Sequence, residues 1–264
     1  MDERPISSTL KLLALASFLF LLAPVVIVLP ISFSGEAFMA FPPATWSARW
    51  YGAMFANKRM IDAFGVSLAL AAVVTAVSLL IAFPAAYALT RARFPGREVL
   101  MSAFTAPLLL PTIVLGLAIL IIFASMGLLG TWSGLVIGHL VITVPYALRV
   151  LATALSTLPA AVEEAAASLG ASGLVVFRRV TLPLAAPGVV ATAALCFLVS
   201  FDEVVISLFL SGARITTLPV EMFHHVETRA DPLVAALSVA LVALTLGVVL
   251  VVERSVGLGR AFVK

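Results

Sequence analysis

The segment from residue 156 to residue 187 reads STLPAAVEEAAASLGASGLVVFRRVTLPLAAP, and it is the most polar stretch between two long apolar runs. Pro159 suits a first helical turn, because its missing N–H would have no partner there. Glu163 and Glu164 place negative charge near a helix N-terminus, where the macrodipole favours it. Gly170 suits a left-handed stop. The sequence therefore predicts a short helix that ends in a tight bend.

A second short helix is expected directly after this bend. Ser172 is a candidate cap at its start. The helix would run through Phe177, Arg178 and Arg179. It would end at Pro183, since proline interrupts helical hydrogen bonding. The segment, about 156–187, is thus expected to be a helix–turn–helix between membrane spans.

The composition indicates a polytopic membrane protein. Of the 264 residues, 62% are hydrophobic and 11% are charged, with a mean hydropathy of +1.19. A soluble domain is about one quarter charged. A span needs about 20 apolar residues, and six runs qualify: Leu12–Phe33, Ala63–Leu89, Val99–Ser125, Gly134–Leu155, Gly188–Ser211 and Leu233–Val252. We predict an all-α fold with six transmembrane helices in a single domain over residues 1–264.

Two features inside this pattern predict local departures from straight spans. Pro107 and Pro111 predict a kink in the third run. Between the first and second runs, residues 34–63 hold prolines and aromatic residues, including Trp46 and Trp50. A short amphipathic helix at the membrane surface is expected there.

Topology follows from the positive charges. With the N-terminus inside, the inner segments hold eleven of the sixteen Lys and Arg residues and the outer segments hold five. Both termini and segment 156–187 are therefore expected on the cytoplasmic side. Three arginines, Arg91, Arg93 and Arg97, lie in the short loop after the second run. We expect them to set this topology and to bind nothing specific.

Several classes of chemistry are not favoured by the sequence. A single cysteine, Cys196, excludes an internal disulfide and a multi-cysteine metal site, and the three histidines lack ligand spacing. No basic run with interleaved aromatic residues indicates nucleic-acid binding. No G-x-x-x-x-G-K-[ST] loop is present. If ATP drives this protein, a separate subunit must bind it.

Asp202 and Glu203 are two carboxylates inside the fifth apolar run. Asp202 would lie about 21 Å along a hydrocarbon core about 30 Å thick. A carboxylate there costs about 2.5 kcal/mol or more and persists where it lines a wet cavity or meets a partner. Adjacent helical residues point about 100° apart, so one of the two is expected to face a pathway. No Lys or Arg lies deep inside the other apolar runs to pair with these carboxylates, which favours a cationic substrate. A structural hydrogen-bonding role or a locally unwound helix are the alternatives.

Segment 156–187 also resembles part of a known family. The spacing of Glu164-Ala165-Ala166, Gly170, Val180 and Leu182-Pro183 is similar to the "EAA" loop of ABC importer permeases, in which Ile is usual at the position of Val180. The resemblance implies a coupling loop that docks on an ATPase subunit. The residues that it assigns to coupling are Glu164, Ala165, Ala166, Gly170, Arg178, Arg179, Leu182 and Pro183.

The same resemblance implies the partners and the location of the protein. We expect two copies of an ATP-binding subunit, a second homologous permease subunit, a periplasmic substrate-binding protein and membrane lipid, with no nucleic acid. ATP and magnesium would be bound by the partner ATPase, and no cofactor is expected in this chain. The chain itself would not be an enzyme. The location implied is the bacterial inner membrane.

The segment Ser200-Phe201-Asp202-Glu203-Val204-Val205 resembles the spermidine/putrescine class of these permeases, in particular the C-type subunit. This resemblance implies a substrate pathway along Ser200, Asp202 and Glu203. Tyr146 and Trp46 would hold a polyamine by cation–π contact, although packing or a membrane-interface role would also explain both.

Two alternatives are kept open. Another small amine, an opine or amino-acid-like compound, or ferric iron would fit the same architecture. A stand-alone ion-coupled carrier or channel would also use intramembrane carboxylates, but the coupling spacing argues against it.

Overall fold

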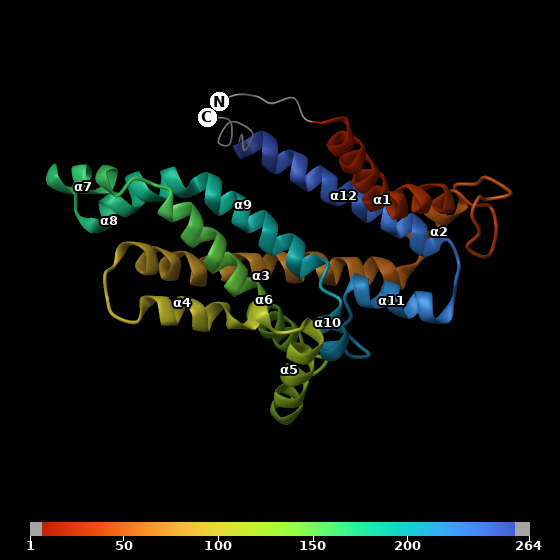
Figure 1. Cartoon of the computed structure of the whole chain (residues 1–264). Helices are drawn as coiled ribbons and strands as arrows, with labels where there is room; N and C mark the ends of the chain where they lie inside the picture. Colours follow the sequence, from red (N-terminus) through yellow and green to blue (C-terminus); the bar gives the residue numbers. More distant parts are fainter. Residues whose placement is uncertain (1–6, 257–264) are drawn as a thin grey trace. The chain divides into compact units, whose positions relative to one another are not determined.

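Helices account for the regular structure of the described residues, 7–256, in the computed structural model, apart from two isolated β-bridges (Figure 1). The elements, in chain order, are α1 (Ser8–Ser32), α2 (Arg49–Ala56), α3 (Lys58–Arg91), α4 (Arg97–Thr105), the 3₁₀ helix η1 (Ala106–Leu109), α5 (Thr112–Met126), α6 (Trp132–Ser156), α7 (Ala160–Ser168), α8 (Gly173–Val176), the π-helix η2 (Phe177–Thr181), α9 (Leu182–Phe201), α10 (Val205–Leu210), α11 (Leu218–Thr228) and α12 (Leu233–Val256).

Five of these helices are long and apolar enough to cross a membrane. They correspond to α1, α3, α6, the continuous helix Gly173–Phe201, and α12. A sixth span results if α4, η1 and α5 count as one bent pair, with an angle of 98° between its halves. The kink predicted from Pro107 and Pro111 is therefore present, and it is a sharp break. The all-α class and the number of expected spans are confirmed.

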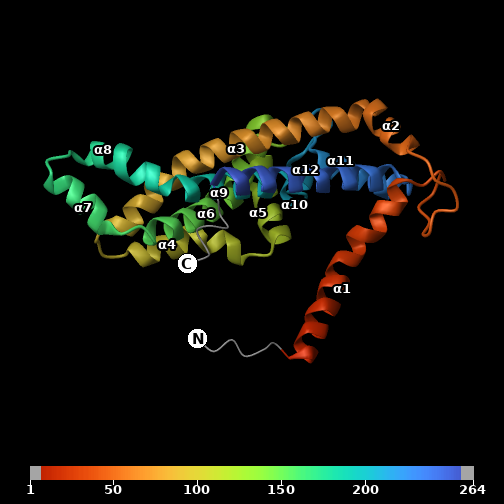
Figure 2. The same ribbon diagram turned by 90° about the horizontal axis from the view of Figure 1, so that it is seen from above.

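The described chain divides into two compact units, residues 7–61 with 222–244, and residues 62–221 with 245–256. The single domain expected over residues 1–264 stays a prediction. In the second unit, α6 is central, because it packs against α9, α10, α4 and α5. Both views place α7, α8 and the loop between α3 and α4 at one end of this unit (Figures 1 and 2).

Small side chains allow close helix approach in the second unit. A Cβ at Gly188 of α9 would lie 2.5 Å from the Cβ of Ala154 on α6. Ala82 and Ala86 of α3 and Ala147 of α6 are buried in the same core cluster. Close backbone approach of this kind is how helices associate in lipid, where apolar burial supplies no driving force.

The first unit holds α1, α2 and the segment between them. That segment folds back on itself, since Gly35 N–H donates to the Thr45 carbonyl at 2.8 Å and Ser47 N–H donates to the Phe33 carbonyl at 2.7 Å. Met39 N–H donates to the Ala230 carbonyl at 3.1 Å, which ties the segment to the end of α11. The short helix expected near the membrane surface is present as α2.

The structure corrects three boundaries. The second helix of segment 156–187 does not end at Pro183, because α8, η2 and α9 form one continuous helix from Gly173 to Phe201. Pro183 therefore lies inside this helix, just after the π-helical turn η2 that interrupts the regular hydrogen-bond pattern. The expected span 188–211 is interrupted after Phe201, and the polar segment 212–232 contains the unpredicted helix α11.

Candidate functional site

The turn after α7 is a complete Schellman motif. Gly170 has a φ of +88°, in the left-handed region that favours glycine. Its N–H donates to the Ala167 carbonyl at 2.9 Å, and the Ala171 N–H donates to the Ala166 carbonyl at 3.2 Å. These two bonds satisfy carbonyls that would otherwise be unpaired at the helix end. The left-handed stop expected at Gly170 is confirmed.

Glu163 holds α7 against the rest of its unit. Arg91, the last residue of α3, donates from Nε to one carboxylate oxygen at 2.9 Å and from Nη2 to the other at 3.3 Å. Thr181 Oγ1 of η2 donates to the same carboxylate at 2.9 Å. The side chains of Arg91 and Glu163 are only 17% and 13% exposed. One carboxylate thus joins α3, α7 and η2.

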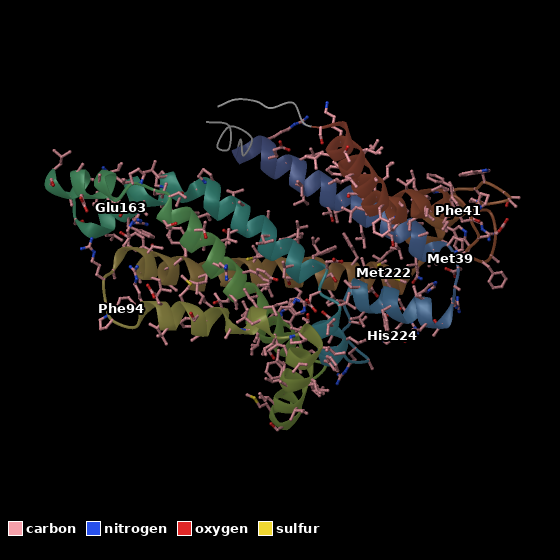
Figure 3. All side chains as sticks on the ribbon, in the orientation of Figure 1. Met39, Phe41, Phe94, Glu163, Met222 and His224 are labelled. Atoms are coloured by element: carbon pink, nitrogen blue, oxygen red, sulfur yellow. The ribbon has the colours of Figure 1, made fainter. Side chains whose placement is uncertain are left out.

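This contact corrects the interpretation of the loop arginines. Arg91 was expected to bind nothing specific, yet it forms a two-pronged ion pair and also donates to the Leu158 carbonyl at 3.2 Å. Figure 3 shows Glu163 and the loop residue Phe94 at the same end of this unit. The sequence carried no signal for the pair, because its members are 72 positions apart.

The residues expected to couple to an ATPase are mostly exposed. Glu164 and Ala165 are exposed on α7, and Ala166 is half-buried. Arg178 and Arg179 are exposed on η2. Leu182 and Pro183 are also exposed at the start of α9.

Apolar side chains that the sequence analysis did not single out stand at the same turn. Leu169 is 90% exposed and Leu174 is 66% exposed. Val162 and Val175 are exposed as well. Apolar side chains that are exposed on α7, on the turn after it and on α8 are candidates for an interaction surface. We call Val162, Leu169, Leu174 and Val175 the apolar tip.

The second candidate site is a break between two helices. α9 ends at Phe201, Asp202 is its C-terminal cap residue, and α10 begins at Val205. The expectation that Asp202 and Glu203 lie on a regular helix, about 100° apart, is therefore wrong. The alternative of a locally unwound helix is the arrangement found.

The two carboxylates have different surroundings at this break. Glu203 Oε1 accepts the backbone N–H of Ile206 at 3.0 Å, which satisfies an N–H in the first turn of α10. Asp202 is exposed, and within residues 7–256 its carboxylate accepts no hydrogen bond and forms no ion pair. Glu203 is thus occupied by the backbone, and Asp202 is the carboxylate available to a ligand.

The other three residues expected along a substrate pathway lie in different settings. Ser200 is buried on α9, and its hydroxyl contacts His139. Tyr146 is 38% exposed on α6. Trp46 belongs to the first unit, is 67% exposed and pairs through its backbone with Ser34. The structure therefore brings Ser200, Asp202 and Glu203 together within the second unit.

Sequence reasoning missed His139. The sequence analysis gave this histidine no role, whereas the structure buries it on α6 against α9 and α10 with both ring nitrogens hydrogen-bonded. A lone histidine in an apolar run was the available signal. Within the described residues, no three His, Cys, Asp or Glu side chains gather as a metal site would require.

Comparison with known proteins assigns the family. The family described as "Binding-protein-dependent transport system inner membrane component" matches residues 78–258, which contain both candidate sites. This chain belongs to that family. The permease is 33% identical over 235 residues to the putrescine transport system permease protein PotI of Escherichia coli, covering 85% of this chain and 82% of PotI. It is 31% identical over 234 residues to the spermidine/putrescine transport system permease protein PotC of Haemophilus influenzae, covering 88% and 90%.

A solved structure has the same fold. A chain from the crystal structure of a bacterial ABC transporter involved in the import of the acidic polysaccharide alginate superposes with a TM-score of 0.69. The match covers 95% of this permease and 99% of that chain at 20% sequence identity. The resemblance to ABC importer permeases stated from the spacing of the coupling segment is confirmed at the level of family and fold.

Proposed function

We propose that this permease subunit imports polyamines, with Asp202 as a carboxylate that contacts the cationic substrate. The observation that carries the proposal is the free Asp202 carboxylate at a helix break in an apolar run. A carboxylate so placed is costly unless a cation or water meets it. The names of PotI and PotC, which are putrescine and spermidine/putrescine permeases, support the same substrate class.

In this proposal, α7 and α8 dock on an ATP-binding subunit. The apolar tip would be covered in that interface, and exposed Glu164, Arg178 and Arg179 would form its polar rim. The Schellman turn at Gly170 and the ion pair of Glu163 would restrain the loop, so that a movement of the ATP-binding subunit would be transmitted to α9. ATP and magnesium would be held by that subunit.

The proposed assembly contains this chain, a second homologous permease subunit, two ATP-binding subunits and a periplasmic binding protein. It would lie in a bacterial inner membrane with both termini of this chain in the cytoplasm. Tyr146 and Trp46 would contribute cation–π contacts along the path. The family name, which specifies binding-protein dependence, supports this assembly over a stand-alone carrier.

The substrate class has a second candidate. Another small amine, an opine or amino-acid-like compound, or ferric iron would also meet a free carboxylate, and the same fold occurs in a transporter that imports the polysaccharide alginate. Polyamines are favoured because relatives at 30% identity or more that cover most of the chain carry polyamine names.

The test uses proteoliposomes that contain the full complex of this chain, its second permease and its ATPase, with the cognate binding protein added outside. We expect ATP-dependent uptake of radiolabelled putrescine or spermidine. Asp202→Asn should raise the KM for putrescine about tenfold or more, since a contact to a charged group contributes about 1.5–3 kcal/mol. Uptake that continues without the ATPase would identify a carrier, and uptake of amino acids or iron instead of polyamines would identify the alternative cargo.

A further inference from the structure

One imidazole ring connects the two sides of the helix break. His139 of α6 is fully buried. Its Nδ1 lies 2.9 Å from Ser200 Oγ, in the last turn of α9, and its Nε2 lies 2.9 Å from Ser207 Oγ, in the first turn of α10. Ser200 precedes Asp202 by two residues, and Ser207 follows Glu203 by four. The ring therefore spans the whole interruption.

The imidazole of His139 is the hydrogen-bond partner of both serine hydroxyls. Within the described chain, neither the Ser200 nor the Ser207 hydroxyl has another hydrogen bond, and both serines are buried. A neutral imidazole donates from one nitrogen and accepts at the other, and a serine hydroxyl fills either role. Burying a polar group without a partner is costly. Each hydrogen bond is thus maintained because its loss would leave a buried group unpaired.

The turn of α6 that carries His139 is held by further hydrogen bonds. Thr143, one turn along α6, donates from Oγ1 to the His139 carbonyl at 2.9 Å and hydrogen-bonds with Ser78 Oγ of α3 at 2.8 Å. The neighbouring Gly138 lets α10 approach α6, because a Cβ there would collide with the side chain of Leu210. The polar chain therefore runs from α3 through α6 to both ends of the break.

We propose that His139 is a positioning residue for Asp202. By fixing Ser200 and Ser207, it sets the separation and orientation of the ends of α9 and α10, and thereby the position of the carboxylate between them. Glu203 completes the arrangement from the α10 side through its contact with the Ile206 N–H. His139 itself does not touch the substrate. The inference rests on the proposed function for the role of Asp202.

Two variants separate the two hydrogen bonds of the ring. His139→Asn places an amide near the position of Nδ1 and keeps a partner for Ser200. His139→Gln reaches the position of Nε2 and keeps a partner for Ser207. Thr192→Val is the matched control, because it removes a buried hydroxyl of α9 that lies outside this network and donates to the Gly188 carbonyl of its own helix at 2.7 Å.

The first measurement is hydrogen exchange of the backbone amides of residues 202–208 in the assembled complex. Both His139 variants should exchange about fivefold faster than the parent, as expected for one lost hydrogen bond. Thr192→Val should match the parent in this segment. Unchanged exchange in the His139 variants, or an equal rise in the control, would show that His139 does not hold the ends of α9 and α10 in place. The yield of purified complex reports any general folding defect separately.

The second measurement is the kinetics of putrescine uptake. Both His139 variants should raise KM about fivefold while the maximal rate stays within about twofold. In an Asp202→Asn background this rise should disappear, because the two residues act on one contact. A His139 effect that persists in full in that background would overturn the positioning role.

The two proposals fail in different ways. If Asp202→Asn alone leaves the KM for putrescine unchanged, the substrate role of Asp202 is wrong, and so is the effect of His139 on substrate. The exchange measurement then still decides whether His139 holds the break. If amide exchange in the His139 variants is unchanged but Asp202→Asn weakens uptake, the proposed function stands and the positioning role of His139 is wrong.

Discussion

Glu163 and Glu164 are adjacent glutamates with opposite surroundings. Glu163 is paired with Arg91 and Thr181 and is 13% exposed, whereas Glu164 is exposed. Substitutions at these two residues can therefore distinguish an effect on the attachment of α7 from an effect on the proposed docking of a partner subunit. A change at Glu163 acts on the attachment of α7 to its own unit, and a change at Glu164 acts on what lies outside.

Glu163→Gln should loosen α7. The amide keeps an acceptor for Thr181 but removes the charge that pairs with half-buried Arg91. We expect amide exchange in residues 160–170 to rise about tenfold, which corresponds to about 1.4 kcal/mol. Arg91→Gln should give a similar effect, and the double variant should be no worse than either single one.

Glu164→Gln is the matched control for this experiment. It should leave exchange in residues 160–170 unchanged, because surface substitutions stay within about 0.5 kcal/mol. Glu164→Lys should lower uptake per ATP hydrolysed, as the proposed interface requires. Equal exchange in the Glu163 and Glu164 variants would show that the ion pair does not hold α7.

At the scale of elements, the coupling segment is a short helix joined by one left-handed residue to a long continuous helix. η2 is a π-helix turn, in which the i→i+4 pattern is replaced by i→i+5 bonding. It carries Arg178 and Arg179 and contributes Thr181 to the Glu163 cluster. Leu174 and Val175 of the apolar tip are therefore connected to α9 through one continuous helix.

Gly170 is the element-scale position with the sharpest prediction. Nothing lies within 4 Å of a Cβ built there, so the positive φ alone demands glycine. Gly170→Ala should cost about 1 kcal/mol in local stability. Gly170→Pro should cost more, since it fixes φ near −65° and removes the N–H bonded to Ala167. Both should lower the ratio of uptake to ATP hydrolysis, with Pro the stronger.

Gly173→Ala is the control for that series. Gly173 also has open space around a Cβ, but its φ is not positive and it begins α8. Alanine favours a helix there by up to about 1 kcal/mol. If Gly173→Ala uncoupled the transporter as strongly as Gly170→Ala, the turn geometry would not be the cause.

At the scale of the whole molecule, most of the apolar surface of the spans is exposed. None of the most apolar window of α1 is buried within this chain. Lipid and partner subunits must therefore cover such surfaces, since in a bilayer apolar side chains are stable when they face lipid tails. The chain by itself therefore forms its helices but leaves much of their apolar surface unburied.

Cysteine labelling in intact cells tests the proposed topology. The native Cys196 is fully buried and should stay unlabelled. Phe38→Cys, at a position 75% exposed in the segment after α1, should react with a membrane-impermeant maleimide added outside. Leu169→Cys, at a position 90% exposed on the apolar tip, should react only after the membrane is permeabilised. Labelling of Leu169→Cys in intact cells would reverse the proposed orientation.

The sequence predicted the class, the spans and the short helix with its turn at Gly170, because those properties depend on local chemistry. Long apolar runs must form helices in lipid, since the backbone has no other way to satisfy its hydrogen bonds. Pro107 and Pro111 interrupt a helix wherever they occur, and the end of α7 needs a residue that tolerates positive φ. The break after Phe201 was missed as a boundary, because an apolar run does not reveal where its helix stops.

The coupling segment from 156 to 187 and its family were determined by the sequence itself. The tertiary structure decided which side chains of this segment are held by other helices and which are exposed. Glu163 is held by residues 18 and 72 positions away, and the helix break is bridged by His139 from 61 and 68 positions away. Such contacts form only when distant helices pack, so no local pattern distinguishes Glu163 from Glu164 or Asp202 from Glu203.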